Sequence, residues 1–317
     1  MEIRRPDLCR RRFLLGSSAV AGALLIHHRQ PGKSSQPEPR AAGARLTSAS
    51  SAGLTGATVN PKPYGSSNWL TGAQIFDSYV GMPLATTVQK IYMTQGQYYT
   101  DPLPSHITSL SGAGCEFIIC VYPSTTTDES AQLATFLQML NSNGIVYQAA
   151  LVNEWNLAGT SFPNPQAYLD YWSHYAPVIQ AAGVKVSSLV CASSTKAQYA
   201  KIQPGFPANP LPDAYWIDYY ATAYYWKVRL DTPGGLLDLA QGEGVPVGIA
   251  EFGWGAGGGG KVSISTWNAY VSYLSGLAPR LPLGCLYWGS EGMDVVTGPS
   301  DQKVPGIQQV ISAFQSG

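Results

Sequence analysis

Two glutamates stand where buried strands are expected to end, and carboxyl groups in such places can exchange protons or attack a substrate. Glu154 closely follows the apolar run 146–152, and Glu251 directly follows the apolar run 247–250. A parallel strand buried on both faces reads as a continuous apolar run. Each glutamate is therefore expected at a strand end that opens on a cleft. Two carboxyls brought to one cleft by different strands form a candidate acid/base pair.

The elements that must position this pair recur regularly along the chain. Apolar runs of strand length follow one another at intervals of about 30 residues, the spacing of βα units. These runs are residues 56–60, 88–93, 117–122, 146–152, 184–191, 217–223, 247–250 and 283–288. The glutamates thus close the fourth and the seventh of eight expected strands.

Helical spacing of apolar residues appears between several of these runs, most clearly over residues 129–140, 166–181 and 263–277. The patterns around Tyr199 and Leu236 are weaker. Strand alternating with helix predicts the α/β class and a single (β/α)8 TIM barrel, in which sites lie at the C-terminal ends of the strands. A doubly wound open sheet has the same alternation, so spacing alone leaves it as the alternative.

The composition is that of a globular protein with an unusual N-terminal segment. Hydrophobic residues make up 45% and charged residues 12% of the 317 positions, which indicates a large core and an uncharged polar surface. Residues 1–45 hold nine of the 19 Lys and Arg residues but only three of the 19 Asp and Glu residues. The remainder is acidic, and without a basic stripe it is not expected to bind nucleic acid.

The N-terminal segment has the organisation of an export signal. The basic stretch Arg10-Arg11-Arg12 is followed by Phe13-Leu14 and an uncharged, largely apolar run to residue 26. It resembles a twin-arginine signal, so we expect a signal peptide over residues 1–28 and a secreted product. The apolar run is shorter than the roughly 20 residues that span a bilayer, so no stable membrane insertion is expected after export. Residues 29–53 predict a disordered linker, and residues 54–317 a folded domain.

Other residue types that carry chemistry do not suggest a cofactor or a metal. Cys120, Cys191 and Cys285 lie in apolar runs and are expected to be buried thiols, although pairing of Cys115 with Cys120 stays open. No C-x-x-C spacing is present and histidines are few, so no metal site is predicted. Residues 253–258 match the letters of a dinucleotide fingerprint, yet they follow the seventh strand and lack the acidic residue about 20 positions later.

The residues beside the two glutamates carry a family resemblance. Asn153-Glu154 and Glu251-Phe252-Gly253 resemble the signature of clan A glycoside hydrolases, the 4/7 superfamily. The resemblance implies that Glu154 is the general acid/base and Glu251 the nucleophile of a retaining double displacement. It also implies that Asn153 binds the sugar 2-hydroxyl. The two carboxyls of a retaining enzyme lie about 5 to 5.5 Å apart.

The expected sixth strand is similar to the family's His-x-Tyr ending. Tyr225 aligns with the tyrosine that orients the nucleophile, Ala223 stands at the histidine position, and Tyr224 competes for the same role. On the second strand, where the family usually has arginine, Lys90 is the nearest basic residue and receives no role.

Tryptophans follow several of the expected strands. Leu286-Tyr287-Trp288 resembles the eighth strand of the family, whose tryptophan forms a floor under the sugar. Trp155, Trp226 and Trp254 are further candidates for stacking against sugar rings, because aromatic faces match the apolar faces of pyranoses. Packing in the core is the alternative for each of them.

These features predict a secreted, monomeric, retaining glycoside hydrolase that cleaves a β-linked glycan without a cofactor. Short loops favour an open groove and endo action on a polysaccharide. A non-catalytic carbohydrate-binding barrel would keep the aromatic residues and misplace a carboxyl. A transglycosylase would use the same two glutamates.

Overall fold

The computed structural model describes residues 54–58, 88–93, 116–144, 146–158, 160, 162–220, 227–253, 263–288 and 303–315. Its strands pair in the closed order β1-β2-β3-β4-β5-β6-β7-β8. Each strand is parallel to its neighbours, and β1 also pairs with β8. The strands are β1 Leu54–Thr58, β2 Val88–Met93, β3 Glu116–Val121, β4 Val146–Leu151, β5 Lys185–Cys191, β6 Ala214–Tyr220, β7 Val247–Gly253 and β8 Gly284–Trp288.

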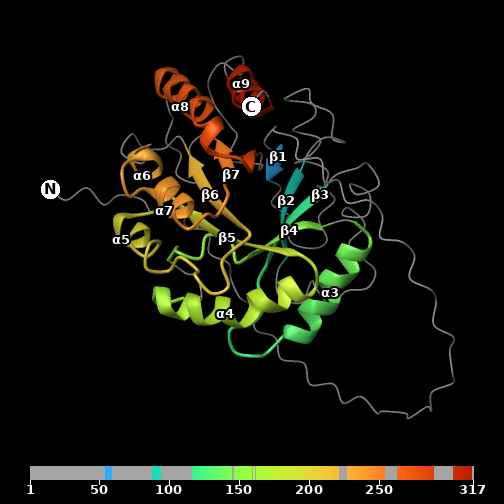
Figure 1. Ribbon diagram of the computed structural model, residues 1–317. Helices are drawn as coiled ribbons and strands as arrows, with labels where there is room; N and C mark the ends of the chain where they lie inside the picture. The colour runs from blue at the N-terminus through green and yellow to red at the C-terminus, as the bar shows by residue number, and fades with distance from the viewer. Residues whose placement is uncertain are drawn as a thin grey trace, which may run out of the picture.

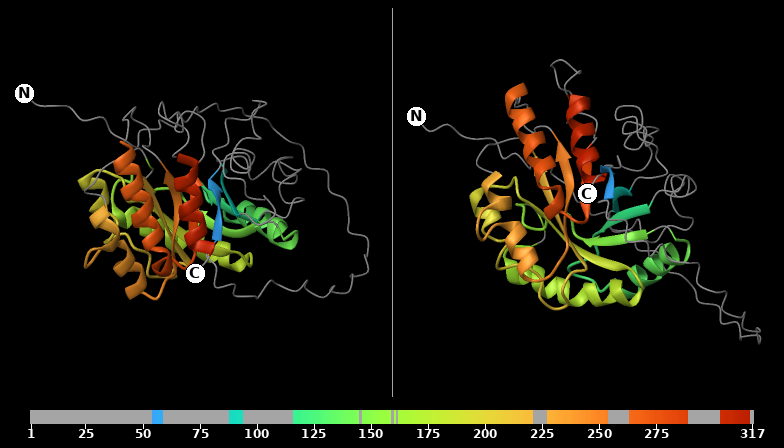
Figure 2. Two further views of the ribbon diagram at one scale, coloured as in Figure 1. Left: turned by 90° about the horizontal axis from the view of Figure 1, so that it is seen from above. Right: turned by 45° about the horizontal axis from the view of Figure 1, so that its top comes forward.

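Helices lie outside the sheet and follow the strands from β3 onward (Figures 1 and 2). They are α3 Ser130–Ser142, α4 Pro165–Ala181, α5 Lys196–Tyr199, α6 Lys227–Asp231, α7 Leu236–Gly242, α8 Ile264–Gly276, the 3-10 helix η4 Ala278–Arg280 and α9 Lys303–Gln315. The α/β class and the curled parallel sheet are confirmed, and the pairing of β1 with β8 excludes the open sheet. The segments after β1 and β2 lie outside the described residues, so the outer helices of those two units stay predictions.

The local sequence explains where the long helices begin. Asn164 accepts a hydrogen bond from the Ala167 amide and precedes Pro165 at the first helical position of α4, which are two signals of a helix start. Ser263 caps α8 in the same way through the Thr266 amide. The apolar face predicted for α3 is buried, with Leu133, Phe136, Leu137 and Leu140 against the sheet.

Alternation along the strands divides the core into two parts. In β3, Ile118 and Cys120 belong to the cluster inside the barrel, whereas Phe117, Ile119 and Val121 belong to the cluster under the helices. This follows from the period of two in a strand. Trp216 fills much of the interior and donates from Nε1 to Gln148 Oε1 at 2.7 Å, which gives the single strongly polar residue of the β4 run a buried partner.

Gly248 makes room for that tryptophan. A Cβ atom built on Gly248 would lie 2.3 Å from the Trp216 ring, far inside van der Waals contact, so the close approach requires glycine. Cys120, Cys191 and Cys285 are buried free thiols, as expected, and Cys115 lies outside the described residues. Among the helices that the structure describes, none is both long and apolar enough to cross a membrane.

Candidate active site

Glu154 is delivered by a tight turn directly after β4. The Val152 amide still donates to Val121 O of β3 at 3.0 Å, and Leu157 N closes the turn on Glu154 O at 3.0 Å. Between these bonds Val152 has φ +66° and Glu154 has φ +49°. A positive φ is a genuine outlier for a β-branched residue, and such outliers persist where the surrounding structure enforces them. The turn therefore fixes the direction of Glu154 through the backbone.

Two buried side chains stabilise this turn, one by hydrogen bonds and the other by packing. Asn156 accepts from Cys191 N at 2.9 Å and donates to Cys191 O at 3.1 Å, so that it bridges the turn to the end of β5. Trp155 is 1% exposed and stacks on Tyr168 of α4, with ring centroids 4.2 Å apart. The prediction that Trp155 is a sugar platform is therefore wrong, because both the burial and the stacking place its indole in the core.

Glu251 is delivered differently, from within β7, where that strand is paired with β6. A register shift between Ile217 and Asp218 of β6 brings Asp218 opposite Glu251. Phe252, the next residue, packs in the cluster under the helices, while Glu251 is 2% exposed and meets other carboxyls inside the barrel. The irregular register is typical of strands that aim a side chain at a site.

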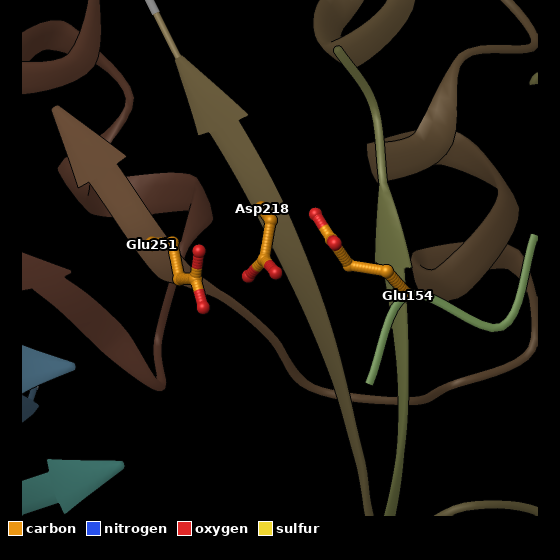
Figure 3. Close-up of side chains that lie close together, drawn as sticks. All are labelled: Glu154, Asp218 and Glu251. Carbon is orange, nitrogen blue, oxygen red and sulfur yellow. The ribbon is translucent and has the colours of Figure 1, made fainter. Parts of the chain in front are cut away.

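Three carboxyls meet at this point. Glu154, Asp218 and Glu251 each have an oxygen atom within 4.8 Å of one in each of the others. Figure 3 shows Asp218 of β6 between the two glutamates. The structure thus brings together the two predicted residues and adds Asp218, which the sequence did not single out. Glu154 is partly exposed, whereas Asp218 is fully buried.

Lys90 of β2 supplies positive charge to the cluster. Its ammonium Nζ lies 2.8 Å from Glu251 Oε1 and 3.3 and 3.4 Å from the two oxygens of Asp218, and the side chain is fully buried. Burial alone would lower the pKa of Lys90, but the Asp218 and Glu251 carboxyls outweigh burial and raise it above its ordinary value. Lys90 is therefore a charged member of the site, although the sequence assigned it no role.

Tyr220, the last residue of β6, donates a hydrogen bond to Glu251 Oε2. This is the kind of contact with the candidate nucleophile that the family resemblance implied for Tyr225. The structure describes β6 as far as Tyr220. Tyr224 and Tyr225 lie outside the described residues.

Burial and the neighbouring charges shift the pKa values of Asp218 and Cys120. Burial, followed by the repulsion of Glu251, raises the pKa of Asp218 well above its usual range, although Lys90 opposes this. Burial likewise raises the pKa of the Cys120 thiol to about 12, with Lys90 opposing. Cys120 is therefore a neutral thiol below the cluster.

Asn153 has a side-chain oxygen that is a candidate contact for a substrate hydroxyl. Its Oδ1 is buried and has no hydrogen-bond partner within the described part of the chain. Buried acceptors are normally paired, and a sugar hydroxyl at the expected position would supply a donor. Trp226 and Trp254 lie outside the described residues, and for Trp288 the structure gives only its place at the end of β8.

Three carboxylates at this spacing could also hold a divalent cation. Lys90 already places an ammonium 2.8 Å from Glu251 and 3.3 Å from Asp218, which is the position that a cation shared by these two carboxylates would need. The donor set therefore fits an internal ion pair better than a metal, because a cation would have to displace a buried ammonium.

Comparison with known proteins shows the fold. No family profile and no curated protein sequence matches the chain. A GH26 beta-mannanase from Bacteroides ovatus aligns with a TM-score of 0.52 and 12% identity over 82% of this chain and 88% of its own. The exo-beta-1,4-mannosidase Op5Man5 from Opitutaceae bacterium strain TAV5 aligns with a TM-score of 0.51 and 11% identity over 84% of this chain and 59% of its own.

A GH128 endo-beta-1,3-glucanase from Amycolatopsis mediterranei aligns with a TM-score of 0.44 and 16% identity, over 83% of this chain and 98% of its own. These solved structures are glycoside hydrolases. At such identities the likeness concerns the fold, so any activity has to be argued from the carboxyl cluster.

Proposed function

We propose that this chain is a retaining glycoside hydrolase that cleaves a β-linked glycan on a (β/α)8 barrel. The observation that carries the proposal is the approach of Glu154 and Glu251 from strands β4 and β7 to within 4.8 Å. An oxygen of each carboxyl within this limit suits retaining enzymes, whose two carboxyls lie about 5 to 5.5 Å apart, better than inverting enzymes, whose carboxyls lie about 6.5 to 9.5 Å apart with a water between them.

The surroundings of each carboxyl suit a different role. Glu251 receives donors at both oxygens, from Lys90 and Tyr220, which stabilises the anion required for attack on the anomeric carbon. Glu154 is partly exposed, so it can reach a glycosidic oxygen and exchange protons with water. In the first step Glu251 forms the glycosyl ester while Glu154 gives its proton to the leaving oxygen. In the second step Glu154 takes a proton from the attacking water.

Asn153 has the geometry for a substrate contact beside the reacting carbon. Its buried Oδ1, which has no partner within the described residues, would accept a hydrogen bond from the sugar 2-hydroxyl, and such a bond can strengthen in the transition state. Trp288 at the end of β8, together with Trp226, Trp254, Tyr224 and Tyr225, stays proposed for substrate contact. Residues 1–28 are proposed as a twin-arginine signal and 29–53 as a linker, so that the enzyme is secreted. We also propose that it acts as a monomer.

The proposal is tested by hydrolysis of β-mannans, β-1,3-glucans, β-1,4-glucans and xylans, with products resolved by size. The mannans enter the panel because two solved structures of similar fold are named a mannanase and a mannosidase. Wild type is expected to release sugar with retained anomeric configuration, while Glu154→Gln and Glu251→Ala lose the activity. Inversion of configuration would contradict the mechanism. Binding without turnover would indicate a carbohydrate-binding barrel, and transfer to sugar acceptors in place of water a transglycosylase.

Export has a separate test. Replacement of Arg10 and Arg11 by lysine in the full chain is expected to keep the protein inside a bacterium that has the twin-arginine pathway, as judged by fractionation. Unchanged export would contradict the signal.

A further inference from the structure

The carboxyl cluster has more acids than its one described cation can balance. Glu154, Asp218 and Glu251 share a space with the Lys90 ammonium. If all three carboxyls were ionised, the cluster would carry a net negative charge in a site where two of them are almost completely buried. Buried uncompensated charge is costly, and such groups take up protons instead. Which carboxyls hold protons can be judged from their hydrogen bonds.

Glu251 has the geometry of the ionised carboxyl. Lys90 donates to one of its oxygens at 2.8 Å and Tyr220 donates to the other. A carboxylate can only accept, and one donor at each oxygen satisfies it. The Lys90 distance is that of a charge-assisted hydrogen bond. A proton on Glu251 would compete with one of these two donors.

Asp218 has a different geometry. Both of its oxygens lie at 3.3 and 3.4 Å from the same ammonium, longer than the about 2.7 to 2.9 Å of a charge-assisted bond. It is fully buried, and its two acidic neighbours, Glu154 and Glu251, lie within the same 4.8 Å cluster. Lys90 thus makes its shorter hydrogen bond to Glu251 and two longer ones to Asp218.

We propose that Asp218 holds a proton at neutral pH, so that Lys90 forms its ion pair with Glu251 and Glu251 stays the ionised carboxyl of the buried pair. Asp218 is then a positioning residue that acts through Lys90. The inference rests on the proposed function for its catalytic meaning, because it explains why the candidate nucleophile and not its neighbour is ionised. The protonation itself can be measured on the protein without any substrate.

The groups around Asp218 agree with this assignment. Lys90 on β2 and Cys120 on β3 face it, as do Glu154 after β4 and Glu251 on β7, and Cys191 on β5 pairs with it in register. Of these groups only Lys90 is positive, and it is closer to Glu251. Burial and the Glu251 charge raise the pKa of Asp218 more than Lys90 lowers it.

The direct test is infrared spectroscopy of the carboxylic acid C=O stretch at pH 7, recorded for the full chain and for Asp218→Asn, Glu251→Gln and Glu154→Gln. We expect wild type to show a band, sensitive to deuterium exchange, that Asp218→Asn removes and Glu251→Gln keeps. Loss of the band in Glu251→Gln but not in Asp218→Asn would place the proton on Glu251 and overturn the proposal. A band that only Glu154→Gln removes would likewise overturn the proposal, because it would place the proton on Glu154.

A second measurement uses stability. A carboxyl whose folded-state pKa is raised binds its proton more tightly in the folded than in the unfolded chain. Its contribution to stability therefore falls as the pH rises from the unfolded pKa of about 3.9 towards the folded value. We expect the Tm of Asp218→Asn to exceed that of wild type by a few degrees at pH 7, and the difference to shrink towards pH 4.

Asp170→Asn provides the matched control, since it makes the same change of side chain at an exposed position of α4. A Tm for Asp218→Asn that is lower than wild type, by a margin that grows with pH, would show an ionised Asp218 paired with Lys90 and overturn the proposal. Because neither readout needs turnover, a failed sugar panel with a positive infrared result would reject the proposed function and leave the proton assignment standing.

Discussion

β4 and β7 each bring one glutamate to the carboxyl cluster, but the two glutamates are held in different ways. Glu251 sits in a paired strand, almost fully buried, and is held by Lys90 and Tyr220. Glu154 sits in a turn with positive φ angles, partly exposed, and the turn is held by Asn156. One carboxyl is fixed by charge and the other by the backbone. Under the proposed roles this difference is useful, because the nucleophile must be ionised when it attacks, whereas the acid/base must give up and regain a proton in every cycle.

The largest effect should come from the carboxyls themselves. Glu251→Ala is expected to lose on the order of 10⁴ to 10⁶ in kcat on every substrate, as for removal of other catalytic nucleophiles. Glu154→Ala should lose about 10² to 10⁴ on natural glycans. It should lose much less on an aryl glycoside whose leaving group needs no protonation. Equal losses of the two variants on that aryl glycoside would remove the distinction between the roles.

Lys90 tests the electrostatic side of the comparison. Lys90→Met leaves the buried Glu251 carboxyl without its cation, so we expect a loss of about 3 to 5 kcal/mol in the free energy of unfolding at pH 7. The cost should shrink below about pH 4, where carboxyls take up protons. Chemical denaturation across this pH range checks both expectations. Lys185→Met, at an exposed lysine of β5, is the control, and an equal cost for the two variants would contradict the role of Lys90.

The sequence predicts the backbone of this site better than its electrostatics. Continuous apolar runs locate eight strands, and the two glutamates follow from where the fourth and seventh runs stop. The partners of Lys90 lie 128 and 161 residues away, and no local pattern connects them. The sequence likewise carried no signal for Tyr220, whose hydrogen bond to Glu251 joins two different strands. Trp155 was misplaced because the identity of a residue after a strand does not tell whether the turn points it outward or inward.

Asn156 tests the backbone side. Asn156→Ala removes bonds to both the amide and the carbonyl of Cys191, which leaves buried groups unpaired and should cost about 1 to 3 kcal/mol. Because the turn carries Glu154, activity on natural glycans should fall roughly 10- to 100-fold, with a smaller loss on the activated aryl glycoside. Asn141→Ala, which removes a hydrogen bond to Ala182 O on the outside of the barrel, should change stability but not this ratio of rates.

The smallest effect concerns the positive φ of Val152. Its side chain is 6% exposed, so both Val152→Ala and Val152→Gly lose packing in the core. Alanine keeps the left-handed strain of about 1 to 2 kcal/mol and glycine relieves it. The glycine variant should therefore be at least as stable as the alanine variant in thermal melts. At Val190, a buried residue of β5 without a positive φ, the order should be reversed, with glycine about 1 kcal/mol less stable than alanine. The same order at both positions would mean that the turn carries no strain, and that hydrogen bonds and packing alone direct Glu154.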